Sequence, residues 1–179
     1  MTQDILALLA DEFRNPFTAN SFEVSVLRLA FAALLGAMIG FEREIHASAA
    51  GLRTHMIIAM ASCLFTLIAA EIMARDYTGA SGLQTDPLRL IEAVTAGVAF
   101  LAAGSIITSG GRVTGLTTGA GMWMAGAIGL ACGEGLMPLA ILATLLAILV
   151  MWLLRRLSRR IAGANLAPGE EDAGEGKPG

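Results

Sequence analysis

Residues 28–44 read RLAFAALLGAMIGFERE, an apolar run that begins at one arginine and ends in three consecutive charges. Extended back to Phe22, the run is long enough to cross a bilayer, which takes roughly 20 helical residues at about 1.5 Å each. Four further stretches have the same character, so the sequence predicts an all-α, polytopic membrane protein with five transmembrane helices. The predicted spans are Phe22–Phe41, Thr54–Met73, Leu90–Thr108, Leu116–Cys132 and Leu136–Leu154.

The composition of the chain excludes several classes of function. Of 179 residues, 55% are hydrophobic and 15% charged, which is too apolar for an ordinary soluble domain and makes the lipid bilayer the expected surroundings. A net charge of −3 provides no basic field for nucleic acid. Cys63 and Cys132 each lie inside an apolar block, which indicates neither a disulfide framework nor a metal site. We therefore expect no cofactor and no bound metal.

The sequence divides into three segments. Residues 1–21 carry apolar side chains at helical spacing without a basic start, which favours an interfacial segment over a signal peptide. Residues 22–161 form the predicted five-helix membrane domain. After Ile161 the chain turns to Gly, Pro, Ala and Glu, so residues 162–179 are predicted to be a disordered acidic tail.

Arginines are distributed unevenly between the two sides of the predicted membrane domain. One side holds Arg43, Arg53, Arg112, Arg155, Arg156, Arg159 and Arg160. The other side holds Arg14, Arg75 and Arg89. Because short loops rich in Lys and Arg stay inside, this predicts a cytoplasmic C-terminus and, with five spans, a periplasmic N-terminus in a Gram-negative host.

An internal repeat is suggested when the sequence is aligned with itself at an offset of 64 residues. Gly40 then aligns with Gly104, and Gly51-Leu52 aligns with Gly115-Leu116. The offset places the first span on the third and the second on the fourth. We therefore predict two parallel helix-hairpin repeats about an axis along the membrane normal, with the fifth helix outside them.

The same offset aligns Arg28 with Glu92, the two charges set deepest in the predicted spans. Arg28 begins a row of small residues that continues through Gly36 and Gly40, and such rows face other helices. An ion pair between Arg28 and Glu92 would lower the cost of placing either charge in the membrane. The pair would either fasten two helices together, or line a polar pocket for a cation or proton; the side chains could also extend to the membrane interface.

Charged and hydroxyl residues gather where the first span ends and where the second and fourth begin. Helix N-termini carry a partial positive charge, so we expect Glu42 or Glu44 to cap one of them. Arg43, Arg53 and Arg112 would supply the surrounding ion pairs. The cluster is either a structural ion network or a recognition patch for a partner protein or cytoplasmic ligand. Its members are Glu42, Arg43, Glu44, Gly51, Leu52, Arg53, Thr54, Arg112, Gly115, Thr117 and Thr118.

Small residues at helical spacing mark faces for close helix packing. The fourth predicted span has the longest such row, and the sequence leaves open whether it packs within one chain or forms a homodimer. The glycines assigned to helix packing are Gly36, Gly40, Gly104, Gly121 and Gly129.

Two separated blocks resemble the signature of the MgtC/SapB family of bacterial membrane proteins. The first is residues 28–40 with FERE at 41–44 and AGLRT at 50–54; the second is residues 97–104 with VTGLTT at 113–118, Trp123 and AIG at 127–129. The resemblance covers roughly Val24 to Leu154 and implies a bacterial inner-membrane protein. Many members carry a soluble domain after the last span, whereas residues 162–179 alone follow here, so we expect a short form without it.

The resemblance also implies a function. The best-studied relatives look like regulators that bind other membrane proteins, including ATP synthase and transporters, under magnesium starvation or other stress. We therefore expect a non-enzymatic protein of magnesium and ion homeostasis that modulates partner inner-membrane proteins. The alternative is a small oligomeric cation transporter or channel, for Mg²⁺ or coupled to protons, with Arg28 and Glu92 on its route. No Ser, Cys or His has an evident base at catalytic spacing, so no catalytic residue is assigned.

Overall fold

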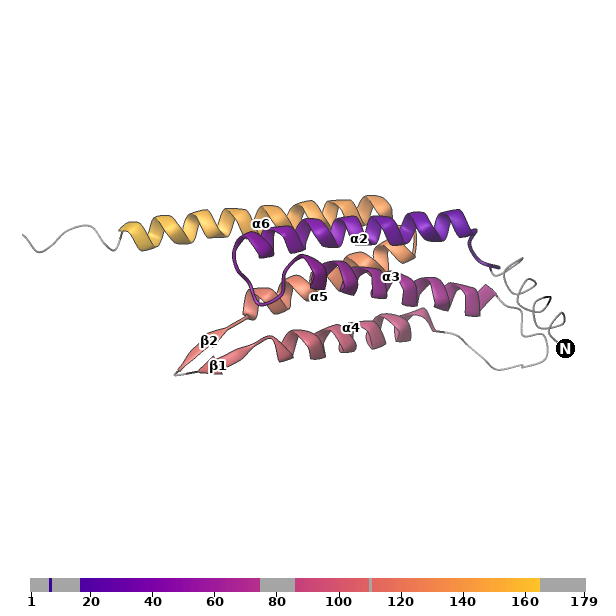
Figure 1. The fold of residues 1–179 in the computed structure, drawn as a ribbon, viewed down its shortest axis with the longest axis horizontal. Coiled ribbons are helices and arrows are strands. Elements are labelled where there is room, and N and C mark those ends of the chain that lie inside the picture. The colour runs from indigo at the N-terminus through magenta and orange to yellow at the C-terminus, as the bar shows by residue number, and fades with distance from the viewer. Residues whose placement is uncertain (1–6, 8–16, 75–85, 110, 165–179) are drawn as a thin grey trace, which may run out of the picture.

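The computed structural model describes residues 7, 17–74, 86–109 and 111–164. Within residues 17–164 of this part, five helices run along the long axis of the molecule, each antiparallel to the next along the chain (Figure 1). They are α2 (Phe22–Ile45), α3 (Leu52–Ala74), α4 (Pro87–Gly104), α5 (Leu116–Gly133) and α6 (Met137–Ala164), with strands β1 (Ile107–Ser109) and β2 (Arg112–Thr114) between α4 and α5. Most of the predicted interfacial segment and acidic tail lies outside the described residues.

Local capping explains where two of the helices begin. The Ser21 hydroxyl accepts a hydrogen bond from the Val24 amide at the start of α2. The Asp86 carboxylate accepts one from the Leu88 amide at 2.9 Å at the start of α4, whose first residue is Pro87. Both arrangements satisfy amides that the first helical turn leaves without a partner.

Helix α5 is the centre of the bundle and contacts each of the other four helices. Its contact with α3 depends on glycine, because a Cβ at Gly129 would overlap the Ala59 carbonyl oxygen, and one at Gly133 would overlap Thr66. A Cβ at Gly121 would lie 2.9 Å from the His55 Nε2 atom. The small-residue row of α5 therefore serves packing within this chain.

Two of the predicted packing glycines lie on α2 and do allow a close approach. A Cβ at Gly36 would lie 2.7 Å from the His55 carbonyl oxygen, and one at Gly40 would lie 2.7 Å from the Leu52 Cα atom. Gly104 is different, since a Cβ there would meet no atom within 4 Å. Among the described residues no other helix lies against Gly104, where α4 ends beside the hairpin, so a packing role for Gly104 stays a prediction.

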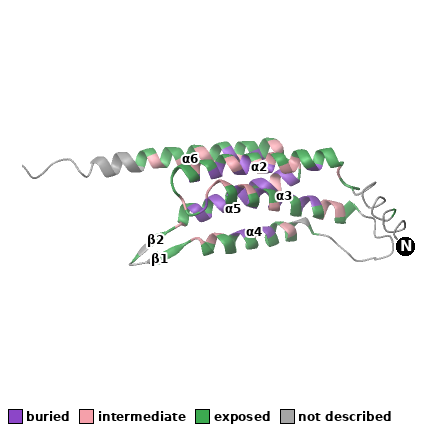
Figure 2. Ribbon diagram, viewed as in Figure 1, coloured by how far each residue is buried: buried purple, intermediate pink, exposed green. Residues whose placement is uncertain are grey.

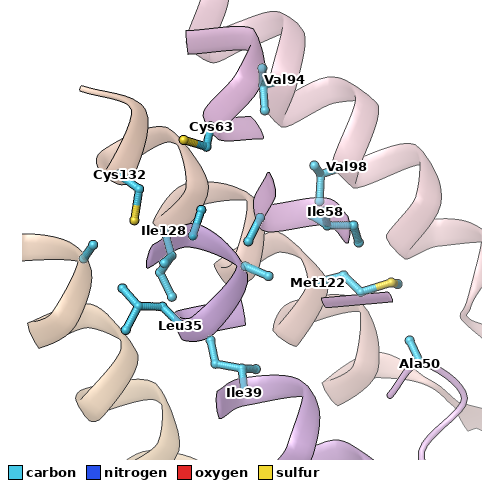
Figure 3. Packing of buried hydrophobic residues seen from close by; sticks show 14 of the residues in the cluster. Leu35, Ile39, Ala50, Ile58, Cys63, Val94, Val98, Met122, Ile128 and Cys132 are labelled. Carbon is cyan, nitrogen blue, oxygen red and sulfur yellow. The ribbon is translucent and has the colours of Figure 1, made fainter. Parts of the chain in front are cut away.

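The hydrophobic core lies mainly between α2, α3 and α5 (Figure 3). Ile39 and Ile128 are the largest apolar side chains that are fully buried in it. Cys63 and Cys132 are buried in the same core and are free thiols. Buried residues concentrate on these three helices, whereas α6 and α4 are mostly exposed (Figure 2).

Three helices are long and apolar enough to cross a membrane: α2, α3 and Met137–Leu157 of α6. In the most apolar window of α6 only 11% of the residues are buried, against 33% in α2 and in α3. Such a helix suits lipid, because its outward side chains are apolar. Helices α4 and α5 have 18 residues each, and the five membrane crossings remain a prediction.

The predicted end of the third span at Thr108 is wrong. It was expected to continue to Thr108, but α4 ends at Gly104 and Ile107–Ser109 pairs with Arg112–Thr114 as an antiparallel hairpin. β-Branched residues on both sides of a glycine-containing turn favour this structure over a helix. At the other end of the chain, α6 continues past the predicted limit of Leu154 to Ala164.

The predicted repeat is reflected in the helix starts, since α3 begins at Leu52 and α5 at Leu116, the residues that the offset aligns. The packing is not equivalent, however. Gly40 lies against Leu52, while its counterpart Gly104 has open space beside it. The two-hairpin repeat therefore remains a prediction.

Candidate functional site

The charged residues singled out in the sequence gather at one end of the bundle. There α2 ends at Ile45, α3 and α5 begin at Leu52 and Leu116, and the hairpin extends outward (Figure 1). The second half of α6 passes the same end. We call this the hairpin end.

Glu42 is the centre of an ion cluster at the hairpin end. Arg43 donates to its Oε2 atom from Nε at 2.6 Å and also from a second guanidinium nitrogen. Arg155 of α6 contacts the Oε1 atom at 3.0 Å, and the His46 Nδ1 atom lies 3.5 Å from the same oxygen. We call these four residues the Glu42 cluster. It fastens α2 to α6.

Because Arg43 and Glu42 are shielded from water, their contact matters for the stability of the fold. Arg43 is only 4% exposed, and the side chain of Glu42 is 14% exposed. A buried guanidinium is tolerated only with a partner, because the loss of hydration is large. The Arg155 Nη1 atom is buried as well, and no described residue forms a hydrogen bond with it.

Glu44, rather than Glu42, caps a helix. Its Oε2 atom accepts a hydrogen bond from the Leu52 amide at 3.0 Å, at the start of α3. A Cβ at Gly51 would overlap this carboxylate, so the cap requires glycine at that position. The arrangement places a negative charge at the positive end of a helix.

The other predicted members of the cytoplasmic motif have separate environments. Arg53 and Thr54 are exposed on the first turn of α3, and Arg53 forms no ion pair with any residue that the structure describes. Gly115 has a positive φ of 89° and precedes α5. Thr117 is exposed and Thr118 is buried in the first turn of α5. The side chain of Arg112 lies outside the described residues.

Arg155 is the residue of the cluster that the sequence did not point to. It belongs to the group of arginines after the last predicted span, which the positive-inside pattern explains by itself. Its contact with Glu42 joins residues more than a hundred positions apart, and no local pattern carries that information. The position of α6 against α2 decides it.

The predicted ion pair between Arg28 and Glu92 is not formed. The Arg28 Nη1 atom donates to the Gly133 carbonyl oxygen at 2.5 Å, and Glu92 is exposed on α4. The last carbonyls of a helix carry a partial negative charge and no helical partner, so α5 supplies what Arg28 needs. Helix α4 meanwhile packs on α5 and α3.

Replacing Arg28 with methionine should lower stability by about 2 kcal/mol, because a hydrogen bond from a charged group to the end of α5 is lost. Arg89→Met is the matched control, since Arg89 is exposed on the first turn of α4. Thermal unfolding of both purified variants in detergent measures the difference. Equal unfolding temperatures would show that the contact to Gly133 contributes nothing.

Glu71 occupies the opposite end of the bundle. Its carboxylate accepts hydrogen bonds from the amides of Thr18, Ala19 and Asn20 at 2.6, 3.0 and 3.2 Å. These bonds fasten the end of α3 to the segment that leads into α2. Among the described residues, no group of three or more His, Cys, Asp or Glu side chains is placed to hold a metal ion.

Apolar helices with uncovered faces and a buried ion cluster at one end are the features of a multi-pass integral membrane protein. Comparison with known families gives a match to the MgtC family over residues 29–160. The chain belongs to this family, which agrees with the resemblance carried by its two sequence blocks. Membership and the apolar helices support a multi-pass inner-membrane protein.

Curated relatives match over most of this chain. "Putative magnesium transporter YhiD" of Escherichia coli (strain K12) is 35% identical over 144 residues, which cover 78% of this chain and 65% of that protein. Protein MgtC of Brucella abortus (strain 2308) is 39% identical over 129 residues, covering 72% and 50%. The chain thus spans about half to two thirds of the length of these relatives. No solved structure matches it significantly.

Proposed function

We propose that this protein is a non-enzymatic regulator of magnesium and ion homeostasis that acts by binding other membrane proteins. The observation that carries the proposal is the division of its charges. Those at the hairpin end come together around the buried Arg43 with exposed charges beside them, whereas the charges expected within the spans do not come together. A surface of this kind suits recognition by a partner.

The placement of Arg28 argues against a cation route between the helices. Its guanidinium is held by the end of α5, and Glu92 lies on an exposed face of α4. The interior between α2, α3 and α5 consists mainly of apolar side chains and close glycine contacts, and its buried polar side chains, His55, Ser62, Thr66 and Thr118, carry no negative charge. An ion crossing there would need polar partners in place of its water.

We place the hairpin end in the cytoplasm. Arg43, Arg53, Arg155 and Arg156 lie at or near this end, in agreement with the positive-inside rule. Partner proteins would then meet the exposed first turn of α3 from the cytoplasmic side. The exposed apolar faces of α4 and α6 would remain for lipid or for partner helices, including a second copy of this chain.

A small cation transporter is the second candidate, because the relative in Escherichia coli bears the name of a magnesium transporter. Flux in proteoliposomes under an inward magnesium gradient separates the two functions. We expect no protein-dependent flux from the wild-type protein and no difference in Glu92→Gln. Saturable flux that Glu92→Gln abolishes would replace the regulator with a transporter.

Arg53→Glu should abolish growth at low magnesium in a strain that depends on this protein, while leaving expression and insertion unchanged. Arg53 is exposed and forms no ion pair with the described residues, so reversing its charge disturbs recognition and not the fold. Arg89→Glu, at the opposite end of the bundle, is the matched control and should support normal growth. Unimpaired growth of both variants would contradict a partner-binding role for the hairpin end.

A further inference from the structure

A cavity of about 480 Å³ opens between α2, α5 and α6, next to the Glu42 cluster. This volume falls within the range of about 300–1,000 Å³ that is typical of ligand sites. On α6 the cavity extends from Ala147 to Arg155, or about 12 Å of helix. Neither the proposed regulation nor the alternative transport function requires it.

One end of the cavity is positively charged. Arg43 and Arg155 both line it, and the exposed Thr117 lies beside them on the first turn of α5. The amides of that turn have no side-chain cap, since Gly115 precedes it. The Arg155 Nη1 atom is buried and has no hydrogen-bond partner among the side chains and backbone groups that the structure describes, which leaves a strong donor available at this site.

The rest of the cavity is apolar. Ile39, Met124 and Val150 line it together with further apolar side chains from α5 and α6. α2 and α6, which form two of its walls, are both long and apolar enough to span the membrane, so the cavity extends from the charged end into the hydrocarbon region. The charged end and the apolar part of the cavity therefore lie at different depths along the membrane normal.

We propose that this cavity binds one anionic phospholipid, with the phosphate on Arg155 and Arg43 and part of an acyl chain between α5 and α6. Charge complementarity selects this occupant, because an unpartnered guanidinium nitrogen and uncapped helix amides bind phosphate oxygens well. The apolar side chains that line the rest of the cavity would contact the acyl chain. A soluble anion would use only the charged end, and an uncharged helix would leave the Arg155 Nη1 atom unsatisfied.

Glu42 shapes the site without occupying it. Its carboxylate contacts the Arg155 Nη2 atom and two nitrogens of Arg43, and these contacts hold both guanidinium groups in place. Two arginines against one glutamate leave a net positive charge. His46 lies near the same Glu42 oxygen as Arg155, but it is exposed and does not line the cavity.

Native mass spectrometry of the purified protein in a neutral detergent tests the proposal, with phosphatidylglycerol and phosphatidylcholine of identical chains as probes. The wild-type protein should bind one phosphatidylglycerol about tenfold more tightly than phosphatidylcholine, because both headgroups carry a phosphate but the choline ammonium of the second is repelled by the two arginines. Arg155→Gln should remove this preference. Arg156→Gln should retain it, because Arg156 lies 4.0 Å over the ring of Trp152 and does not line the cavity.

A second pair of variants tests the acyl chain. Ala120 is exposed and lines the cavity, so Ala120→Phe fills the space without displacing the core and should weaken both lipids at least fivefold. Ala96→Phe, on the exposed face of α4, should leave both unchanged. If Arg155→Gln fails to fold, Arg155→Lys should still lower the preference, because it keeps the charge and loses the planar fork.

Four results would overturn the proposal. Equal affinity for the two lipids would exclude selection of a net negative headgroup by the two arginines, and equal losses in Arg155→Gln and Arg156→Gln would reduce the effect to general surface charge. Displacement of the lipid by millimolar inorganic phosphate would make this a site for a free anion. A second copy of the chain, retained in place of lipid and lost in Ala120→Phe, would make the cavity a dimer contact.

Discussion

Gly129→Ala is expected to lower the stability of the protein by about 3 kcal/mol, although it adds a single methyl group. The new Cβ atom would overlap the Ala59 carbonyl oxygen and would lie 2.8 Å from the Ser62 Cβ atom. Neither neighbour is the end of a flexible side chain, so α3 and α5 must move apart. Because α5 contacts α2, α3, α4 and α6, that movement disturbs the whole bundle.

The same substitution at Gly97 is the matched control for Gly129→Ala. Gly97 also lies inside a helix, but a Cβ there meets no atom within 4 Å. Gly97→Ala should therefore leave stability unchanged or raise it by up to about 1 kcal/mol, since alanine favours the helix. Thermal unfolding followed by circular dichroism in detergent compares the two variants. Equal midpoints would show that α3 and α5 are not in close contact.

Glu42→Ala should destabilise the protein by about 3 kcal/mol or more. The substitution leaves Arg43, which is 4% exposed, without its carboxylate partner, and an uncompensated buried charge is costly. It also breaks the contact with Arg155 that fastens α2 to α6. Glu42→Gln, which keeps one oxygen acceptor, should cost less than Glu42→Ala.

Glu92→Ala is the control for Glu42→Ala. Glu92 is exposed on α4, so its removal should change the unfolding midpoint very little. The sequence predicts Glu92 to be paired within the membrane, whereas in the structure it is exposed and Glu42 holds the buried arginine. Similar losses in both variants would mean that Arg43 does not depend on Glu42.

The helices themselves were predictable to within a few residues at most ends. α5 begins at Leu116 as expected, and α2 begins at Phe22. Long apolar runs bounded by glycine or charge leave few alternatives in a membrane, where each backbone amide must find a partner within the chain. The β1–β2 hairpin was missed because Ile106, Ile107 and Thr108 continue the apolar run, and hydropathy does not distinguish a strand from the end of a helix.

The candidate site was predictable in part. Acidic and basic residues were correctly assigned to one end of the bundle, and one of the two expected carboxylates, Glu44, does cap α3. The pairing of Arg28 with Glu92 was not correct, because the carbonyl groups at a helix C-terminus also attract arginine, and no sequence pattern indicates which helix end will lie nearby. The role of Arg155 could not be predicted either, because its contact with Glu42 depends on how α6 packs against α2.

The amino-acid sequence by itself determined the class of this protein: an apolar chain of long helices, two motif blocks that place it in its family, and glycines positioned for close packing. Tertiary structure decided the partner of each charge and the position of the cavity. The physical reason is the range of the forces involved. Hydropathy and helix capping act over a few neighbouring residues, whereas the contacts of Arg28 with Gly133 and of Glu42 with Arg155 exist only once distant helices have packed.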